Sequence, residues 1–281
     1  MFDFFKKRRR EATTREPFPE EWMRYIRRNV SHFAVLPDDE RAQLLDDLRI
    51  FRAEKTWEGA GGLMLTDEIT VTISALACLL TLGLPGRDDY FRGVSTIIVY
   101  PAGYRVTETR LANPVGVLET GHSWRLGEAW RGGPVILSWA DARAGGRGKA
   151  SGSNVVLHEF AHKLDMEDGN AEGTPVLYSD AQYDEWHRVM SRAYERLRGR
   201  LWWKYRGLDG DLVLDPYGAT DAAEFFAVAT EAFFERPRAL RRRWRDLYAV
   251  LQGYYRQDPA ARVVRYLRGM HRNERPLWFG E

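Results

Sequence analysis

The chain has 281 residues, enough for one large hydrophobic core or two small ones, and its 42 Lys and Arg residues nearly balance its 40 Asp and Glu residues. The net charge of +2 excludes a strong overall field that would recruit nucleic acid or a membrane surface, so any such binding has to be local. The single Cys78 excludes an intramolecular disulfide and favours a reducing compartment, so we expect a cytoplasmic protein. No apolar run follows the basic residues Lys6 to Arg10, and we expect no secretory signal peptide.

The first third of the chain has a helical pattern. Apolar residues recur at helical spacing in 19–33 and in 36–57, and the second segment opens with Pro-Asp-Asp-Glu, which suits a helix start. The apolar run 69–84 contains three Thr and one Ser, and its length of about 16 residues is below the roughly 20 that span a bilayer. We therefore predict a buried helix capped at Thr66 or Asp67, and no transmembrane segment.

The pattern becomes β-rich between residues 94 and 139. Short β-branched or alternating runs lie between Gly and Pro residues, at 94–101, 103–111, 115–124 and 133–142. They predict a small mixed or antiparallel sheet. A flexible Gly-rich loop is expected at 143–153, and Ser153 or Asn154 then caps a helix. Further helices are predicted at 180–200, 221–235 and 237–257.

The predicted fold class is α+β, in one compact unit over 21–260. This unit would have a helical front at 21–90 and a catalytic core at 91–260. We expect residues 1–20 to form a flexible basic tail and residues 261–281 to form a C-terminal tail, because charged chain ends are usually solvated.

The motif HExxH, formed by His158, Glu159 and His162, predicts a metal site. At i, i+4 spacing the two imidazoles leave one face of a helix and can both bind a tetrahedral zinc ion at about 2.0–2.1 Å. Glu159 lies next to the first ligand and can serve as the general base toward a water molecule that the metal acidifies. The alternative is a helix with two unrelated histidines, but the capped, apolar entry "SNVVL" favours a buried metal-binding helix.

A catalytic zinc site needs a third protein ligand. The candidates are Asp165, Asp168, His187 and Glu224. Asp165, three residues after His162, is better placed to orient that imidazole than to bind the metal. His187 lies among charged residues and is expected on the surface. Glu224 lies in an apolar helix, where a buried carboxylate needs a partner or a metal, and is our first choice.

Glu224 also has an interpretation that needs no metal. Asp221 with Glu224 three residues later matches a capping box, and spacing alone does not decide between cap and ligand. Glu231 lies on the same helix face at i+7 and is expected to take no part, so that Glu231→Gln would keep most metal and activity.

The segments "HEFAHKLDMEDG", "YGATDAAEFFAVATEAFF", "GGPVILSWAD" and "YYRQDPAAR" resemble the Mlc titration factor A family of bacterial zinc-dependent peptidases, over about residues 36–260. The resemblance implies a zincin-like, gluzincin-type fold in which His158, His162 and Glu224 bind one catalytic zinc ion and Glu159 is the base. It also implies that Tyr217, seven residues before the ligand Glu, donates to the oxyanion of the tetrahedral intermediate.

The resemblance implies a zinc-dependent peptidase with aminopeptidase-like activity that acts on a peptide or protein. The alternative is a regulator that sequesters a transcriptional repressor, because the family's founding member binds the repressor Mlc. A retained Glu159 beside an open metal position favours catalysis over a structural zinc site. The run 133–139 would suit an edge strand that pairs with an extended substrate. No direct contact with nucleic acid is expected.

Overall fold

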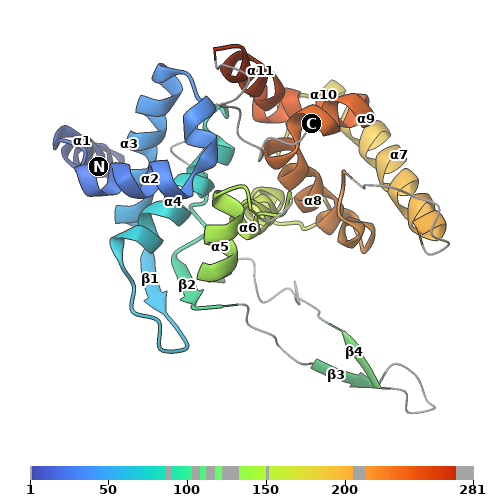
Figure 1. The fold of residues 1–281 in the computed structure, drawn as a ribbon, viewed down its shortest axis with the longest axis horizontal. Helices are drawn as coiled ribbons and strands as arrows, with labels where there is room; N and C mark the ends of the chain where they lie inside the picture. Colours follow the sequence, from blue (N-terminus) through green and yellow to red (C-terminus); the bar gives the residue numbers. More distant parts are fainter. Residues whose placement is uncertain are drawn as a thin grey trace.

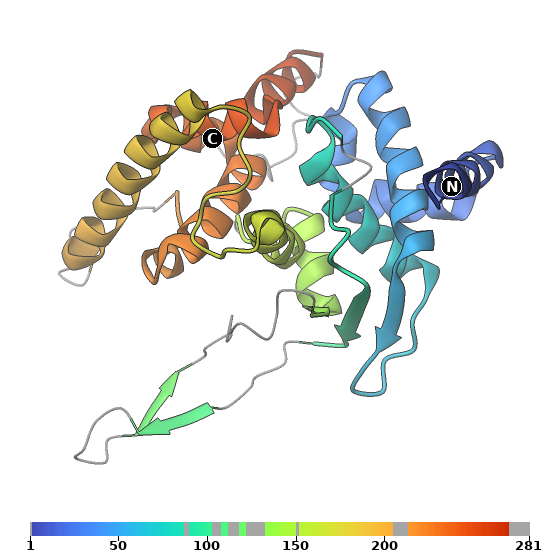
Figure 2. The ribbon, with the colours of Figure 1, turned by 180° about the vertical axis from the view of Figure 1, so that it is seen from behind.

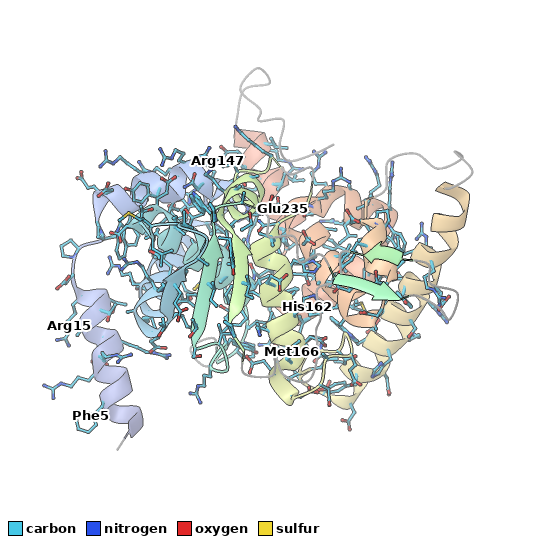
Figure 3. All side chains as sticks on the ribbon, turned by 90° about the horizontal axis from the view of Figure 1, so that it is seen from below. Phe5, Arg15, Arg147, His162, Met166 and Glu235 are labelled. Carbon is cyan, nitrogen blue, oxygen red and sulfur yellow. The ribbon has the colours of Figure 1, made fainter. Side chains whose placement is uncertain are left out.

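The computed structural model describes residues 2–86, 90–102, 108–111, 118–121, 133–149, 152–204 and 213–269. The N-terminal helices and a small sheet form one side of the molecule, and the C-terminal helices form the other (Figures 1 and 2). Helix α6, Val155–Asp165, lies between these two sides and packs against α4, Asp67–Thr81, and α8, Ala222–Glu235. Figure 3 shows His162 and Met166 along this central region. The helix that carries HExxH is therefore held from both directions.

The N-terminal side is helical, as the sequence predicts. Its elements are α1 (Phe2–Arg15), α2 (Glu20–Asn29), the 3-10 helix η1 (Ser31–Val35), α3 (Asp38–Glu54) and α4. Helix α4 begins at the predicted cap, because the Thr66 side chain accepts from the Ile69 N–H, and it is buried from Ile69 to Thr81. None of the helices that the structure describes combines the length and the apolar character that crossing a bilayer requires.

Residues 2–15, for which we expected a flexible tail, form helix α1 at the edge of the molecule (Figure 3). The Arg10 guanidinium donates to both carboxylate oxygens of Glu54 at 2.7 and 2.8 Å. Arg49 donates to the carbonyl oxygens of Thr14 and Glu16, at the C-terminal end of the helix, where carbonyl groups lack helical partners. These charged contacts attach part of the basic segment to α3.

The main sheet is parallel, not mixed or antiparallel. Its strands are β1 (Thr56–Gly59), β2 (Thr96–Tyr100) and β5 (Val135–Ser138), in the order β1-β2-β5. In the central strand β2, Ile97 pairs with Trp57 of β1 on one side and with Val135 of β5 on the other. Each connection between paired strands is long enough for a crossover, which parallel pairing requires. A separate antiparallel pair consists of β3 (Glu108–Leu111) and β4 (Leu118–Gly121).

The chain after the sheet is mainly helical. Its helices are α5 (Trp139–Gly146), α6, the 3-10 helix η4 (Met166–Asp168), α7 (Asp180–Lys204), the 3-10 helix η5 (Pro216–Ala219), α8, α9 (Pro237–Arg243), α10 (Arg245–Tyr255) and α11 (Pro259–Gly269).

Three predictions about these helices differ from the structure. Helix α5 occupies part of the expected loop at 143–153, because Ser138 caps it by accepting from the Asp141 N–H. The single helix predicted at 237–257 is two helices, since Trp244 takes a non-helical conformation between them and buries its ring. Helix α11 continues beyond the expected boundary at 260.

Helix α8 is buried from Ala223 to Glu235, and aromatic packing holds it in place. Phe226 contacts the Trp186 ring of α7 edge to face at 5.6 Å, and Phe233 stacks on Tyr255 of α10 at 5.6 Å between centroids. Such pairs contribute about 0.5–1.5 kcal/mol each beyond the burial of their area. This packing fixes the position of α8, and with it the position of the side chains that α8 directs at α6.

Candidate metal centre

Helix α6 places the two histidines of HExxH side by side. Asn154 caps the helix, as predicted, by accepting from the Leu157 N–H at 3.3 Å. Leu157, Phe160 and Ala161 are fully buried and fix the rotation of the helix about its axis. The rings of His158 and His162 lie 4.8 Å apart, and their Nε2 atoms are separated by 3.2 Å. One turn of helix therefore directs both nitrogens to a common point, as i, i+4 spacing requires.

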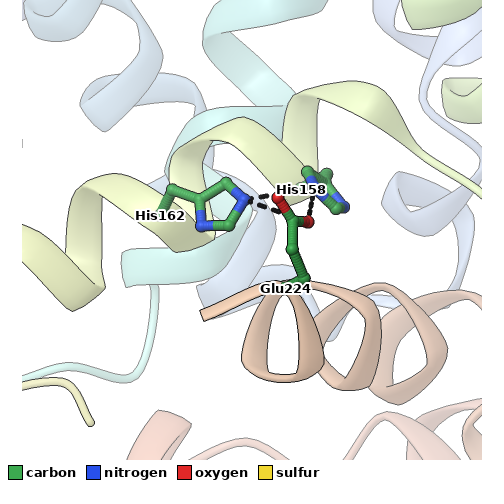
Figure 4. Close-up of side chains that lie close together, drawn as sticks. All are labelled: His158, His162 and Glu224. Carbon is green, nitrogen blue, oxygen red and sulfur yellow. Dashed lines mark hydrogen bonds and ion pairs between the residues drawn. The ribbon is translucent and has the colours of Figure 1, made fainter. Parts of the chain in front are cut away.

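Glu224 of α8 reaches the same point (Figure 4). Its Oε2 lies 3.0 Å from the Nε2 atom of His158 and 3.5 Å from that of His162. Asp221 caps α8 by accepting from the Glu224 N–H at 2.9 Å. The Glu224 carboxylate faces the histidines, so only the Asp221 half of the predicted capping box is present. Asp221 thus caps the helix, while the Glu224 carboxylate is directed at the histidines as a ligand would be.

The three donor atoms have spacings that suit a zinc ion. Two ligands about 2.0–2.1 Å from a tetrahedral zinc ion lie about 3.3 Å apart, and the three observed separations are 3.0, 3.2 and 3.5 Å. Two imidazole nitrogens and one carboxylate oxygen also form a donor set that zinc accepts. Among the residues described, this is the one group in which three His, Cys, Asp or Glu side chains converge in this way.

Electrostatics favour a charged carboxylate at this point. Burial would raise the pKa of Glu224, but hydrogen bonds to His158 and His162 and their charges lower it to about 2. Burial would likewise lower the pKa of His158, but contacts with Glu224 and Glu231 raise it well above its ordinary value. The carboxylates therefore attract positive charge, either a proton on the imidazole or a metal cation.

Glu159 extends from α6 beside His158 and is partly buried. Burial raises the pKa of its carboxyl group, and the neighbouring His158 and His162 oppose that rise, while the charge of Glu224 adds to it. A carboxylate with a raised pKa is a stronger base at neutral pH, which suits the role predicted for this residue.

Tyr217 borders the site from η5. Its hydroxyl group donates to Glu224 Oε1 at 3.3 Å, and its ring lies 6.2 Å from the His158 ring. Asp215 holds the backbone here by accepting from the Tyr217 N–H at 2.8 Å. Burial and the Glu224 charge raise the pKa of the phenol, so it keeps its proton and stays a donor. With 36% of its surface exposed, Tyr217 is also open to a substrate.

The other candidates for the third ligand lie elsewhere. Asp165 was expected to orient His162, and this expectation is wrong: its two oxygens accept from the N–H groups of Gly173 and Thr174 at 2.9 and 2.7 Å. Burial raises the pKa of Asp165 to about 6 although these two bonds oppose the rise. His187 is exposed on α7, as expected for a surface residue. Asp168, also exposed, accepts from the Asn170 N–H at 2.8 Å.

The residue that orients a histidine is Glu231, which we expected to take no part. Its Oε1 accepts from His158 Nδ1 at 2.7 Å, and its Oε2 accepts from the Asn154 N–H at 2.5 Å and the Ser153 hydroxyl at 3.0 Å. The bond at Nδ1 leaves Nε2 of His158 as the atom available to a metal. Glu231 could have been found by the argument used for Glu224, since it is a carboxylate in an apolar helix.

A second buried carboxylate continues this network. Glu235 Oε1 accepts from the Asn154 side-chain amide at 2.8 Å and lies 3.4 Å from His32 Nε2. Burial raises the pKa of Glu235 to about 8 against the opposing effect of Asn154, and the charge of Glu231 adds to the rise. Burial lowers the pKa of His32 to about 4, so the imidazole is neutral at pH 7. The network thus links the N-terminal side of the molecule to the cap of α6.

Comparison with known proteins identifies the family. The sequence profile described as "Glucose-regulated metallo-peptidase M90" matches residues 4–256. The chain belongs to this family. An uncharacterized protein of Synechocystis is 36% identical to this M90 chain over 255 residues, 89% of each chain. Mlc titration factor A of Pectobacterium atrosepticum is 32% identical over 253 residues, 87% of this chain and 88% of the relative. That of Yersinia pestis is 29% identical over 249 residues, 88% of this chain and 89% of the relative.

Membership of the M90 family gives the cluster its context. A metallopeptidase holds a metal ion, and His158, His162 and Glu224 offer the one converging set of metal-ligating groups in the described part of the chain. The resemblance to the Mlc titration factor A family is confirmed over most of the chain. The fold is α+β, with a parallel three-stranded sheet in place of the mixed sheet we predicted.

Proposed function

We propose that the protein is a zinc-dependent peptidase in which His158, His162 and Glu224 hold one zinc ion. The observation that supports this most directly is the convergence of two imidazole nitrogens and a carboxylate oxygen at 3.0–3.5 Å from one another. The metallopeptidase family of the chain points to the same chemistry. A set of three protein ligands leaves a position open for substrate and water, as catalytic zinc sites do.

The surrounding residues have distinct tasks in this proposal. When bound, the zinc ion would polarise the scissile carbonyl group and acidify a water molecule. Glu159 accepts the proton of that water and passes it to the leaving amine, a task that its raised pKa assists. Tyr217 keeps its hydroxyl proton and donates it in a hydrogen bond to the oxyanion of the tetrahedral intermediate. Glu231 orients His158 through a hydrogen bond at Nδ1, the ring nitrogen that faces away from the metal position.

We further propose that an extended substrate pairs with strand β5. In the part of the sheet that the structure describes, β5 is an edge strand, and it lies against α6. Lys163, next to His162 in sequence, has its Nζ atom 3.4 Å from the Gly133 carbonyl, just before the strand. Main-chain pairing along this edge would carry a peptide past the metal-binding helix. We also propose that the enzyme cleaves peptides from their N-terminus, as an aminopeptidase does.

A second function is favoured by the names of the relatives. Two of those compared are called Mlc titration factor A, so a repressor that the chain sequesters is the alternative partner. In that case the metal would be structural, and the two functions can also coexist. We place both in the cytoplasm, where the free, buried Cys78 stays reduced.

Zinc analysis combined with a peptide-library digest tests the proposal. We expect about one zinc ion per chain and cleavage that a chelator stops and added zinc restores, because only the metal is removed. The digest would also reveal whether cleavage begins at the N-terminus of each peptide. A zinc-loaded chain that cleaves no peptide, with or without chelator, would contradict the peptidase proposal and leave the binding function.

A further inference from the structure

A pocket of about 290 Å³ lies on the side of the molecule formed by α7, α9 and α10, and none of the residues around the metal cluster lines it. Helices α7 and α10 pack against each other, and α9 precedes α10 along the chain (Figures 1 and 2). The volume is close to the lower end of the range for small-molecule sites, about 300–1,000 Å³.

The rim of this pocket is strongly basic. Six arginines line it, and Asp246 is the one acidic residue among its lining residues. The arginines are Arg188, Arg192 and Arg196 of α7, and Arg242, Arg243 and Arg245 around the start of α10. The whole chain carries a net charge of only +2, so positive charge is concentrated here. A nearly neutral chain can therefore still have a strongly positive potential at one site on its surface.

Arginines from two sides line the same pocket. Arg188, Arg192 and Arg196 are spaced i, i+4, i+8, so they lie on one face of α7 about 6 Å apart along its axis. Arg242 and Arg245 border the pocket from the opposite side. Among the residues described, Arg192, Arg242 and Arg245 are exposed and have no carboxylate partner. Their mutual repulsion is relieved when an anion enters.

The floor of the pocket is apolar and fixed. Val189, Ala193, Trp244 and Leu247 are each at most 7% exposed. The guanidinium group of Arg196 lies 4.1 Å from the centre of the Trp244 ring and donates to the Arg243 carbonyl at 3.1 Å. Since Arg196 is already ordered, less entropy is lost when it binds a ligand. The floor and the Arg196 side chain therefore hold part of the pocket in a fixed shape.

We propose that this pocket binds a phosphate-bearing small molecule. A phosphate group carries up to about two negative charges on three strong acceptor oxygens, and several planar guanidinium forks can bind it together. A single carboxylate has only two oxygens and one charge, which leaves most of the rim unpaired. An extended nucleic acid would need basic groups along a track longer than this pocket. The compact, two-sided arrangement favours a small, multiply charged oxyanion.

Calorimetric titration of the full chain with inorganic pyrophosphate tests the inference. The pocket variant is Arg192→Gln/Arg242→Gln, and the control is Arg198→Gln/Arg27→Gln, which removes the same charge from two exposed arginines outside the pocket. An acidic peptide and a short single-stranded oligonucleotide of matched total charge serve as competitors. A thermal-unfolding scan of each variant, with pyrophosphate and at equal ionic strength with chloride, gives an independent readout.

We expect the wild-type chain and the control to bind pyrophosphate and to gain thermal stability from it. The pocket variant should bind at least about tenfold more weakly, because each charge-assisted hydrogen bond contributes substantially to affinity. Equal affinity of the pocket variant and the wild-type chain would overturn the inference, as would the absence of binding at millimolar pyrophosphate. Tighter binding of the peptide or the oligonucleotide would overturn it as well and would assign the surface to that class of macromolecule.

Discussion

Replacing Glu231 by Gln tests whether this residue supports the metal centre. The carboxylate accepts from the His158 ring with one oxygen and from the Asn154 backbone and the Ser153 hydroxyl with the other. An amide has one oxygen and one NH₂ group, so a donor must face a donor on one side. If the NH₂ group faces His158, the ring is driven to carry its proton on Nε2, the atom at the metal position. If it faces Asn154, the Asn154 N–H loses its acceptor on α8, and the bond from the Asn154 side chain to Glu235 remains.

The size of the effect follows from these contacts. A hydrogen bond to a charged group contributes about 1.5–3 kcal/mol, and losing a residue that orients a metal ligand costs about 10–100-fold in metal affinity. That fold range corresponds to about 1.4–2.8 kcal/mol, so the two estimates agree. We therefore expect Glu231→Gln to bind zinc about 10–100-fold more weakly than the wild-type chain, with peptide hydrolysis reduced at limiting zinc.

Competition with a chelator of known affinity measures the change in zinc affinity. Urea unfolding of the metal-free chains separates a loss of fold from a loss of metal binding. Glu195→Gln is the matched control, because Glu195 is an exposed residue of α7 whose one ion pair among the described residues is with Arg198 of the same helix. A Glu231→Gln chain that binds zinc within about twofold of the wild type would refute the role assigned to Glu231.

The remaining predictions concern the third ligand, the substrate strand and a buried acid. Glu224→Gln should stay folded, since Asp221 still caps α8, but lose zinc on dialysis and lose activity; retained zinc would contradict its role as ligand. A folded Ile136→Pro chain should keep zinc and lose peptide cleavage, and surviving cleavage would exclude β5 as the substrate strand. Because the folded-state pKa of Glu235 is raised from 4.5 to about 8, the fold holds a proton that the unfolded chain releases. The contribution of Glu235 to stability should therefore fall as the pH rises from about 5 to about 8, and urea unfolding of Glu235→Gln over this range should lack that contribution.

Local chemistry made part of the site predictable. The caps at Thr66 and Asn154 depend on side chains that bond to the next turn of the same helix, and both are present. The relation between His158 and His162 depends on helical spacing alone. Glu224 could be selected because a carboxylate in an apolar helix needs a partner, although its position 66 residues from His158 gave no geometric information.

The features that depend on tertiary contacts could not be predicted from the sequence. The Glu231 carboxylate meets His158 across 73 residues. The i+7 spacing places Glu231 on the same helix face as Glu224, but it does not show that this face packs against α6. Asp165 has the spacing expected of a residue that orients His162, but the loop after α6 uses both of its oxygens. Strand direction likewise depends on which runs pair, and alternation of side chains within a run does not reveal it. Trp244 ends α9 because its ring is buried, a packing effect that the helical pattern around it conceals.

The zinc content and the peptidase rate of Glu159→Gln, measured on the same sample, test the metallopeptidase mechanism most directly. The metal ligands are unchanged in this variant, so we expect about one zinc ion per chain, as in the wild type. Without the carboxylate that accepts the proton of the attacking water, peptide hydrolysis should fall by about 100-fold to 10,000-fold. A zinc-loaded Glu159→Gln chain that cleaves peptides at the wild-type rate would contradict the proposed metallopeptidase mechanism.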